Sequence, residues 1–326
     1  MRHAARRLSA FLILTALAAC DNVEWGGQSV KIVPPPPRTA EVAPEEAEGG
    51  APQLGLPRGT VLFHVTLRGQ GATVVPVAEV SGDSLRTLRI PPGVAPEAYV
   101  SRFRQTVLPA NTELELFRHG ARVGTVTVTG EGPLTPCGLP TATGTGATVA
   151  AAADQTDFLA FRRQLGPEVL GEYGPPQVGG TINRYASIVA ERLVLEAGLP
   201  RPRSWAGARR DLQALNLVRG GDPEMAATYL SGDTLGVGPG EETGYAVFYV
   251  ATYETRTGYT PVYSDTRDYR RGGKAAPRLV DYLDWNGAGG NEMLIQVHGR
   301  DQSWYEAVSA DDGGRWRRIW AGQPCR

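Results

Sequence analysis

The chemistry that this sequence predicts most clearly involves Cys20 and the residues before it. The chain opens with arginines at positions 2, 6 and 7, continues as an apolar run over residues 8–19, and places two alanines directly before the cysteine. A basic start, a short apolar stretch and small residues at a cut are typical of a secretory signal peptide. The run is too short to cross a bilayer, which takes about 20 apolar residues. We therefore expect residues 1–19 to be a signal peptide.

The four residues Leu17-Ala18-Ala19-Cys20 resemble the lipobox of bacterial lipoproteins. The resemblance implies a diacylglycerol on the sulfur of Cys20, cleavage after Ala19 and an acylated new N-terminus. Two or more acyl chains anchor a protein firmly, whereas one is marginal. The expected location is therefore the bacterial cell envelope, with the protein held to the membrane by lipid and facing the periplasm or the cell exterior. The alternative is an ordinary signal peptide followed by an incidental cysteine.

The two remaining cysteines, Cys137 and Cys325, form an even pair once Cys20 carries lipid. An even number of cysteines in an oxidising compartment favours a disulfide, so we predict that these two are bonded. Closing so long a loop would stabilise the fold by up to about 5 kcal/mol on the chain-entropy view. The alternative is two buried free thiols.

A glycine-rich loop from Asp284 to Glu292 resembles the calcium loop of FG-GAP and VCBS repeats, which lies between two strands. The resemblance implies that Asp284, Asn286 and Glu292 would ligate calcium together with backbone carbonyls and water. Calcium takes six to eight oxygen ligands, which such a turn can supply. The sequence departs from the family at Ala288, where the pattern has an acid. A hairpin loop without metal is the alternative.

No catalytic constellation is predicted. Histidine is scarce, and outside the leader it occurs only at His64, His119 and His298, far apart in the sequence. Residues 82–85 resemble the nucleophile block of GDSL hydrolases. That family also carries a C-terminal D-x-x-H motif, and none of these histidines has an aspartate three residues before it. A hydrolase with a site between two domains remains an alternative, because such a site is assembled by the fold.

The elements that would carry these residues divide the chain into segments. Residues 20–57 include four consecutive prolines and an acidic stretch, which indicate an extended tether with too little apolar surface to fold alone. Residues 58–130 show apolar residues at period two and predict a small β-rich domain. Residues 131–154, rich in threonine, glycine and alanine, are expected to be a linker. Residues 155–326 are expected to form an α+β domain that ends in antiparallel strands.

The expected fold class is α+β and β-rich. A helix is predicted near Pro96–Leu108, a short one near Thr156–Leu165, and a clearer one that begins at Thr181 and ends before Gly198. His119-Gly120 is expected to be a hairpin turn. The final strands are predicted as a meander over Tyr245–Glu254, Arg278–Trp285, Glu292–His298, Trp304–Ala310 and Trp316–Trp320.

The net charge and the aromatic residues indicate which kinds of partner the protein could bind. The formal net charge is −1, and removal of the leader with its three arginines lowers it to about −4, so we expect no nucleic-acid binding. Tyr245, Tyr249 and Tyr253 are spaced to share one face of a strand. That face could bind a glycan or a protein; the alternative is that it forms part of a β-domain core and its rim. We expect a membrane-anchored, non-catalytic binding or envelope-scaffold protein whose partner is an envelope protein or glycan; a calcium-stabilised extracytoplasmic module is a further alternative.

Overall fold

The computed structural model describes residues 54–169, 173–217, 221–311, 314–322 and 324, together with two short strands near the N-terminus. The chain divides into two compact units, residues 1–51 and residues 52–326. In the first unit the strands β1 (Glu24–Trp25) and β2 (Gln28–Ser29) pair antiparallel. The predicted signal peptide, Cys20 and the proline run lie outside the described residues.

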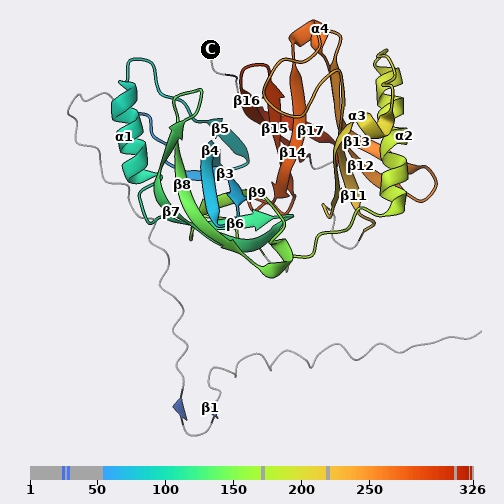
Figure 1. Ribbon diagram of the computed structural model, residues 1–326. Helices are drawn as coiled ribbons and strands as arrows, with labels where there is room; N and C mark the ends of the chain where they lie inside the picture. The colour runs from blue at the N-terminus through green and yellow to red at the C-terminus, as the bar shows by residue number, and fades with distance from the viewer. Residues whose placement is uncertain are drawn as a thin grey trace, which may run out of the picture. The chain divides into compact units, whose positions relative to one another are not determined.

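The second unit begins with a closed six-stranded antiparallel barrel (Figure 1). Its strands follow the order β3-β9-β6-β7-β8-β4, and β3 pairs with β4 to close it, while β5 extends the sheet beside β4. The elements are β3 (Thr60–Arg68), β4 (Gly71–Ser81), β5 (Ser84–Thr87), α1 (Pro96–Thr106), β6 (Glu113–Arg118), β7 (Ala121–Leu134), β8 (Pro140–Thr148), the 3-10 turn η1 (Ala150–Ala152) and β9 (Asp157–Arg162).

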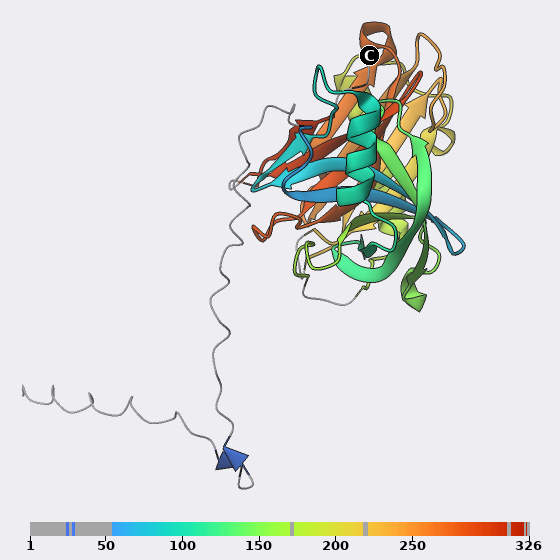
Figure 2. The ribbon, with the colours of Figure 1, turned by 90° about the vertical axis from the view of Figure 1, so that its left-hand side faces the viewer.

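The barrel core comes from the alternating residues of its strands, because successive side chains on a strand point to opposite faces. The helix α1 begins with Pro96 in its first turn, as predicted, and buries Tyr99, Val100 and Phe103 against this core. In Figure 2 the barrel faces the viewer and α1 lies across its near side. The predicted hairpin turn between β6 and β7 is confirmed, since His119 and Gly120 adopt φ angles of 50° and 71°.

Two four-stranded antiparallel sheets follow the barrel. The first comprises β10 (Arg209–Leu215), β11 (Glu224–Ser231), β12 (Tyr245–Glu254) and β13 (Gly258–Asp268). The second comprises β14 (Ala275–Leu283), β15 (Glu292–Gly299), β16 (Ser303–Ala310) and β17 (Trp316–Ala321). Three helices accompany them: α2 (Gly180–Glu196), α3 (Trp205–Ala208) and α4 (Tyr269–Gly272).

These parts of the second unit pack as successive layers. The helix α2 covers one face of the β10–β13 sheet, where Val189, Tyr245 and Tyr249 share a core. The other face of that sheet packs on the β14–β17 sheet through residues such as Phe248 and Ile295. The far face of the β14–β17 sheet packs on the outside of the barrel. Strands buried on both faces explain the long apolar runs in β12 and β15.

The predicted β-rich α+β class is confirmed, and the five predicted final strands form close to their predicted positions. Only the last four, β14 to β17, make one meander, because the first, Tyr245–Glu254, is β12 of the other sheet and pairs there with β11 and β13. Two further predictions differ from the structure. Residues 131–154, expected to be a linker, contain the end of β7, β8 and η1. Their small residues are needed because the strands approach closely: a Cβ on Gly144 would lie 2.6 Å from the carbonyl oxygen of Thr127. The barrel consequently extends to Arg162, well past the predicted domain boundary at residue 130.

The short helix expected at Thr156–Leu165 is instead the strand β9 (Asp157–Arg162). Its four central residues are all apolar, and a run this short does not distinguish a helix from a strand buried on both sides. Phe158 and Ala160 point into the barrel, whereas Leu159 and Phe161 face the β14–β17 sheet. Burial on both faces therefore removed the alternation that would have revealed a strand.

Candidate functional site

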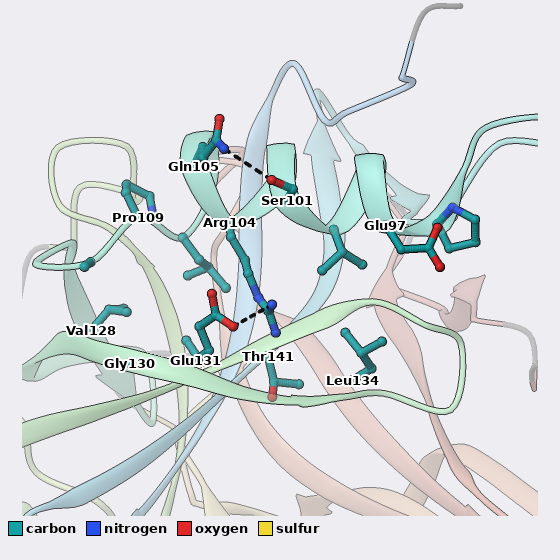
Figure 3. A pocket seen from close by; sticks show the side chains of 15 residues that line it. Glu97, Ser101, Arg104, Gln105, Pro109, Val128, Gly130, Glu131, Leu134 and Thr141 are labelled. Carbon is teal, nitrogen blue, oxygen red and sulfur yellow. Dashed lines mark hydrogen bonds and ion pairs between the residues drawn. The ribbon is translucent and has the colours of Figure 1, made fainter.

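A groove of about 730 Å³ lies between α1 and the β7–β8 hairpin (Figure 3). One wall is the helix, which contributes Glu97, Ser101 and Arg104 among others. The other wall is the distal half of β7, from Val128 to Leu134, with neighbouring residues of β8. The groove therefore lies between a helix and the part of β7 that extends beyond the end of β6.

The groove exists because β7 is longer than β6. Pairing of the two strands ends at Thr127, and the loop before β6 adds two last bonds, from Asn111 N to Val128 O (2.8 Å) and from Val128 N to Thr112 O (2.9 Å). Beyond Val128, β8 is the only strand that pairs with β7 in the described part of the chain. The backbone groups of β7 that point away from β8 thus form an open strand edge, which is a template for a further strand.

Arg104 crosses the groove from the helix to this edge. Its Nη1 lies 2.6 Å from a carboxylate oxygen of Glu131, and its Nη2 donates to the carbonyl of Gly132 at 3.3 Å. Its Nε is buried and has no hydrogen-bond partner among the residues that the structure describes. Figure 3 shows the side chain reaching down from α1 to Glu131. The Glu131 side chain is 69% exposed, so this ion pair contributes at most about 1 kcal/mol and can open at little cost.

The floor of the groove is apolar. Val100, Leu108, Val128 and Ala142 lie on it and are buried in the barrel fold, and Leu134 stands at one end with half of its surface exposed. An apolar cavity with a few placed polar groups is the usual character of a ligand site. Here the polar groups are a strand edge and several side chains on the walls, among them Glu97, Ser101 and Arg104, and the strand edge suits an extended polypeptide.

A second polar assembly lies at the junction between the barrel and the β14–β17 sheet. His64 on β3 is hydrogen-bonded through Nε2 to Asp157 and through Nδ1 to the hydroxyl of Tyr305 on β16, both at 2.9 Å. Arg278 on β14 donates to both carboxylate oxygens of Asp157, at 3.1 and 3.2 Å. Burial alone would raise the pKa of Asp157, but the hydrogen bonds from His64 and Arg278 and the nearby positive charge lower it well below its usual range.

A histidine between a carboxylate and a hydroxyl has the connectivity of an activated nucleophile. In this chain, however, the three groups bridge two packed layers, and burial raises the pKa of the Tyr305 hydroxyl. None of His64, Asp157 and Tyr305 lines the groove or the hollow beside Cys137 that is described below. The assembly joins the barrel to the β14–β17 sheet. Neither of these cavities gives a substrate access to it, so it does not support the hydrolase alternative.

A neighbouring buried pair extends this junction. Arg118 on β6 donates to the carbonyl of Val280 and lies 3.6 Å from Asp281, which also accepts from the backbone of His119. Burial raises the pKa of Asp281 to about 6, against the opposing effect of Arg118. Burial likewise lowers the pKa of His119 to about 3. Charged and neutral polar groups are therefore both enclosed between barrel and sheet.

The three residues predicted to bind calcium each accept a hydrogen bond from a different backbone amide of their own loop. Asp284 accepts from Gly289, Asn286 from Ala288, and Glu292 from Trp285, at 2.7 to 3.1 Å. These bonds close the loop without metal. One oxygen of Asp284 is buried without a hydrogen-bond partner, but among the described residues no three His, Cys, Asp or Glu side chains are placed to hold an ion together. Calcium binding stays a prediction.

Cys137 lies in the turn between β7 and β8 and lines a hollow of about 880 Å³ together with Ala321 and Pro324. Cys325 and Cys20 lie outside the described residues. The residue before Cys325 thus borders the same hollow as Cys137, which supports the predicted disulfide, and the bond itself stays a prediction.

Two of the three tyrosines of the predicted aromatic face are core residues. Tyr245 and Tyr249 are 1% and 0% exposed beneath α2, and their hydroxyls donate to the carbonyls of Pro200 and Ala186. Tyr253, the third, is half-buried and packs at the edge of the same core. Most of the aromatic face considered from the sequence is therefore covered by this helix. The groove beside α1 was not found from the sequence, because no motif marks the end of β6 relative to β7.

Comparison of the chain with protein-family models, curated proteins and solved structures finds no match. In the part of the chain that the structure describes, no helix has both the length and the apolar content needed to cross a membrane.

Proposed function

We propose that this chain is a lipid-anchored protein of the bacterial cell envelope whose barrel binds an extended peptide segment of an envelope protein. The role is one of binding and carries no catalytic step. The observation that carries the proposal is the open edge of β7 facing α1 across an apolar groove (Figure 3). The lipobox at Leu17–Cys20 supports the envelope location, and the acidic mature chain agrees with a partner other than nucleic acid.

The dimensions of the groove indicate what it holds. The helix α1 has 11 residues and is therefore about 17 Å long. An extended chain rises about 3.3 Å per residue, so roughly five residues would lie along the helix. Backbone pairing with β7 would supply affinity, and apolar side chains directed at Val100 and Leu108 would supply selectivity. Arg104, released from Glu131, would offer its donors to a peptide carbonyl or carboxylate.

Filling the groove is expected to abolish most peptide binding. Ser101 is exposed on the groove side of α1, so Ser101→Trp places an indole where the peptide would lie. Arg102 is equally exposed but does not line the groove, and Arg102→Trp is the matched control. Peptides selected from a random library on the full mature protein should bind Ser101→Trp at least about tenfold more weakly, equivalent to about 1.4 kcal/mol. Titration calorimetry measures the difference.

The control variant should keep the affinity of the unmodified protein. Hydrogen exchange should also show that a bound peptide protects amides of Thr129–Gly132, because a new strand would pair with that edge. Peptides that bind both variants equally, or protection confined to another part of the barrel, would contradict the proposal. Failure to select any peptide against the full chain would do the same.

A further inference from the structure

A lysine side chain is buried against an aspartate at one end of the two four-stranded sheets. The Nζ of Lys274 lies 2.6 Å from Oδ1 of Asp233, and the two side chains are 3% and 0% exposed. Lys274 lies between α4 and β14, whereas Asp233 lies in the loop after β11. Figure 1 shows α4 at this end of the sheets. The contact therefore joins the two sheets through residues that are 41 positions apart in the sequence.

The carboxyl group of Asp233 is held through both of its oxygens. The hydroxyl of Tyr269 donates to Oδ2 at 2.6 Å, and the backbone amide of Thr234 donates to Oδ1, also at 2.6 Å. Burial raises the pKa of Tyr269, and its hydrogen bond to Asp233 raises this pKa further, so the hydroxyl stays protonated and remains a donor. The carbonyl of Thr234 accepts from the Nζ of Lys274 at 3.2 Å. The amine and the carboxyl are thus both oriented.

The surroundings of this pair are apolar and closely packed. Tyr269, which contacts Asp233, belongs to a buried cluster with Leu230, Ala246 and Ala276. A Cβ on Gly240 would lie 3.0 Å from the ring of Tyr269 and 3.4 Å from Cγ of Asp233, so glycine allows the loop to close over both. Two charges enclosed in this way have lost their hydration, which is costly for an ion pair.

The residue type at position 274 is informative. The chain carries its positive charge almost entirely on arginine, and its lysines are Lys31 and Lys274. Arginine suits a buried ion pair better, because the guanidinium is weakly hydrated and pairs with a carboxylate through two hydrogen bonds. The amine of lysine differs in being a nucleophile once it is desolvated and neutral. A lysine enclosed against a carboxyl group therefore has a reaction available to it that an arginine would not have.

We propose that Lys274 and Asp233 form an intramolecular isopeptide bond. A proton first passes from Nζ to Oδ1, which leaves a neutral amine beside a carboxylic acid. The amine attacks Cγ and a C–N bond forms; Oδ1 then takes a second proton from the nitrogen and leaves as one water molecule. Oδ2 becomes the amide oxygen, and the hydroxyl of Tyr269 stabilises the negative charge that develops on it in the intermediate. No oxidant, cofactor or second substrate takes part.

The product removes the cost of the buried charges and ties the two sheets together. One neutral amide replaces an ammonium and a carboxylate that have no access to water. The loop from Asp233 to Lys274, which includes β12 and β13, is then closed covalently at the start of β14. A closed loop restricts the unfolded chain and so stabilises the fold, as a disulfide does. This inference goes beyond the peptide groove and depends neither on it nor on the lipid anchor.

Tryptic digestion of the full chain, reduced to open any disulfide, tests the bond by mass spectrometry. Trypsin cleaves after arginine and after free lysine, so an unlinked chain gives a peptide of residues 220–256 and a short one that ends at Lys274. An acylated lysine is not cleaved. The linked chain should therefore give residues 220–256 joined to residues 272–278, at the summed mass of these two peptides less one water.

Variants assign the roles of the three side chains. Lys274→Arg keeps the charge but has no amine, so only the unlinked peptides should appear, whereas Lys31→Arg, the matched control, should leave the link in place. Tyr269→Phe keeps the ring and removes the donor, and it should slow formation of the bond at least about tenfold after synthesis.

Unlinked peptides alone from the unmodified protein would overturn the inference, as would the same linked product from Lys274→Arg. Equal rates of linkage in Tyr269→Phe and the unmodified protein would refute the role given to the hydroxyl. None of these results bears on peptide binding at the groove, which has its own test.

Discussion

Replacing Asp157 with alanine is expected to lower the free energy of unfolding by about 3 kcal/mol. The carboxylate accepts hydrogen bonds from His64 and from both terminal nitrogens of Arg278, and its side chain is only 16% exposed. Removing one partner of a buried pair is costly because the other charge, here Arg278, is left desolvated and uncompensated. Denaturation by urea, followed by tryptophan fluorescence, measures the loss.

The stabilisation from Asp157 should depend on pH in a defined direction. Its pKa in the folded protein is lower than its ordinary value of 3.8, so the contribution is present above that pH and disappears as the pH falls below it. The difference in stability between the unmodified protein and Asp157→Ala should therefore shrink in acid.

A surface ion pair provides the matched comparison for Asp157. Glu113 and Arg163 lie 2.6 Å apart, with side chains 44% and 56% exposed. Glu113→Ala should cost less than about 1 kcal/mol, because solvent screens the pair. Equal losses for Glu113→Ala and Asp157→Ala would show that the junction between barrel and sheet does not depend on the buried assembly.

Replacing Glu292 with glutamine is expected to stabilise the protein at pH 8 by up to about 3 kcal/mol. Glu292 is 3% exposed, and burial raises its pKa to about 7, with a further contribution from Asp284. A shift of one pKa unit corresponds to 1.36 kcal/mol, and the ordinary value for this carboxyl is 4.5. Glutamine keeps the oxygen that accepts from the Trp285 amide but carries no charge.

The pH window follows from the sign of that shift. A carboxyl with a raised folded pKa stabilises the fold fully below its unfolded value and loses this contribution as the pH rises toward the folded value. Ionisation of Glu292 should therefore lower the free energy of unfolding progressively as the pH rises from about 4.5 to about 7. The advantage of Glu292→Gln should be absent at pH 4 and complete at pH 8, as urea denaturation at the two pH values would show.

Glu242, an exposed carboxylate of the loop before β12, is the control for this prediction, and Glu242→Gln should not change the pH profile. Added calcium distinguishes a loop that binds the ion from a loop that is closed only by its own hydrogen bonds. If Asp284, Asn286 and Glu292 bind the ion, Glu292→Gln should be destabilising in millimolar calcium, contrary to the metal-free loop. An identical pH profile for the variant and the unmodified protein would refute the placement of a buried, neutralised Glu292.

The sequence predicts the outer elements of the fold better than the barrel. The helix over residues 181–197 has a clear apolar stripe and a glycine stop, and it forms as α2. The strand β9 could not be predicted because both of its faces are buried, and β8 could not because its glycines reflect close strand packing. In both cases the sequence pattern is determined by tertiary neighbours that are distant along the chain.

The candidate sites are harder to predict for a related reason. His64 and Tyr305 are 241 residues apart and meet only because β3 and β16 lie on facing layers. The groove depends on where β6 ends relative to β7, and a one-residue change in strand length leaves no motif. The predicted lipidation site differs, because its sequence signal is contiguous and does not depend on the fold.

The proposed binding of an envelope peptide at the groove requires that the folded chain lies outside the cytoplasm, so the state of Cys20 tests the account most directly. Intact-mass and peptide mass spectrometry of the protein extracted from membranes should show a mature N-terminus at Cys20 carrying diacylglycerol and an amide-linked acyl chain. Cys20→Ala should prevent processing at this position and remove the lipid. An unmodified Cys20, whether in a chain that retains residues 1–19 or in one cut elsewhere and released from the membrane, would contradict the account.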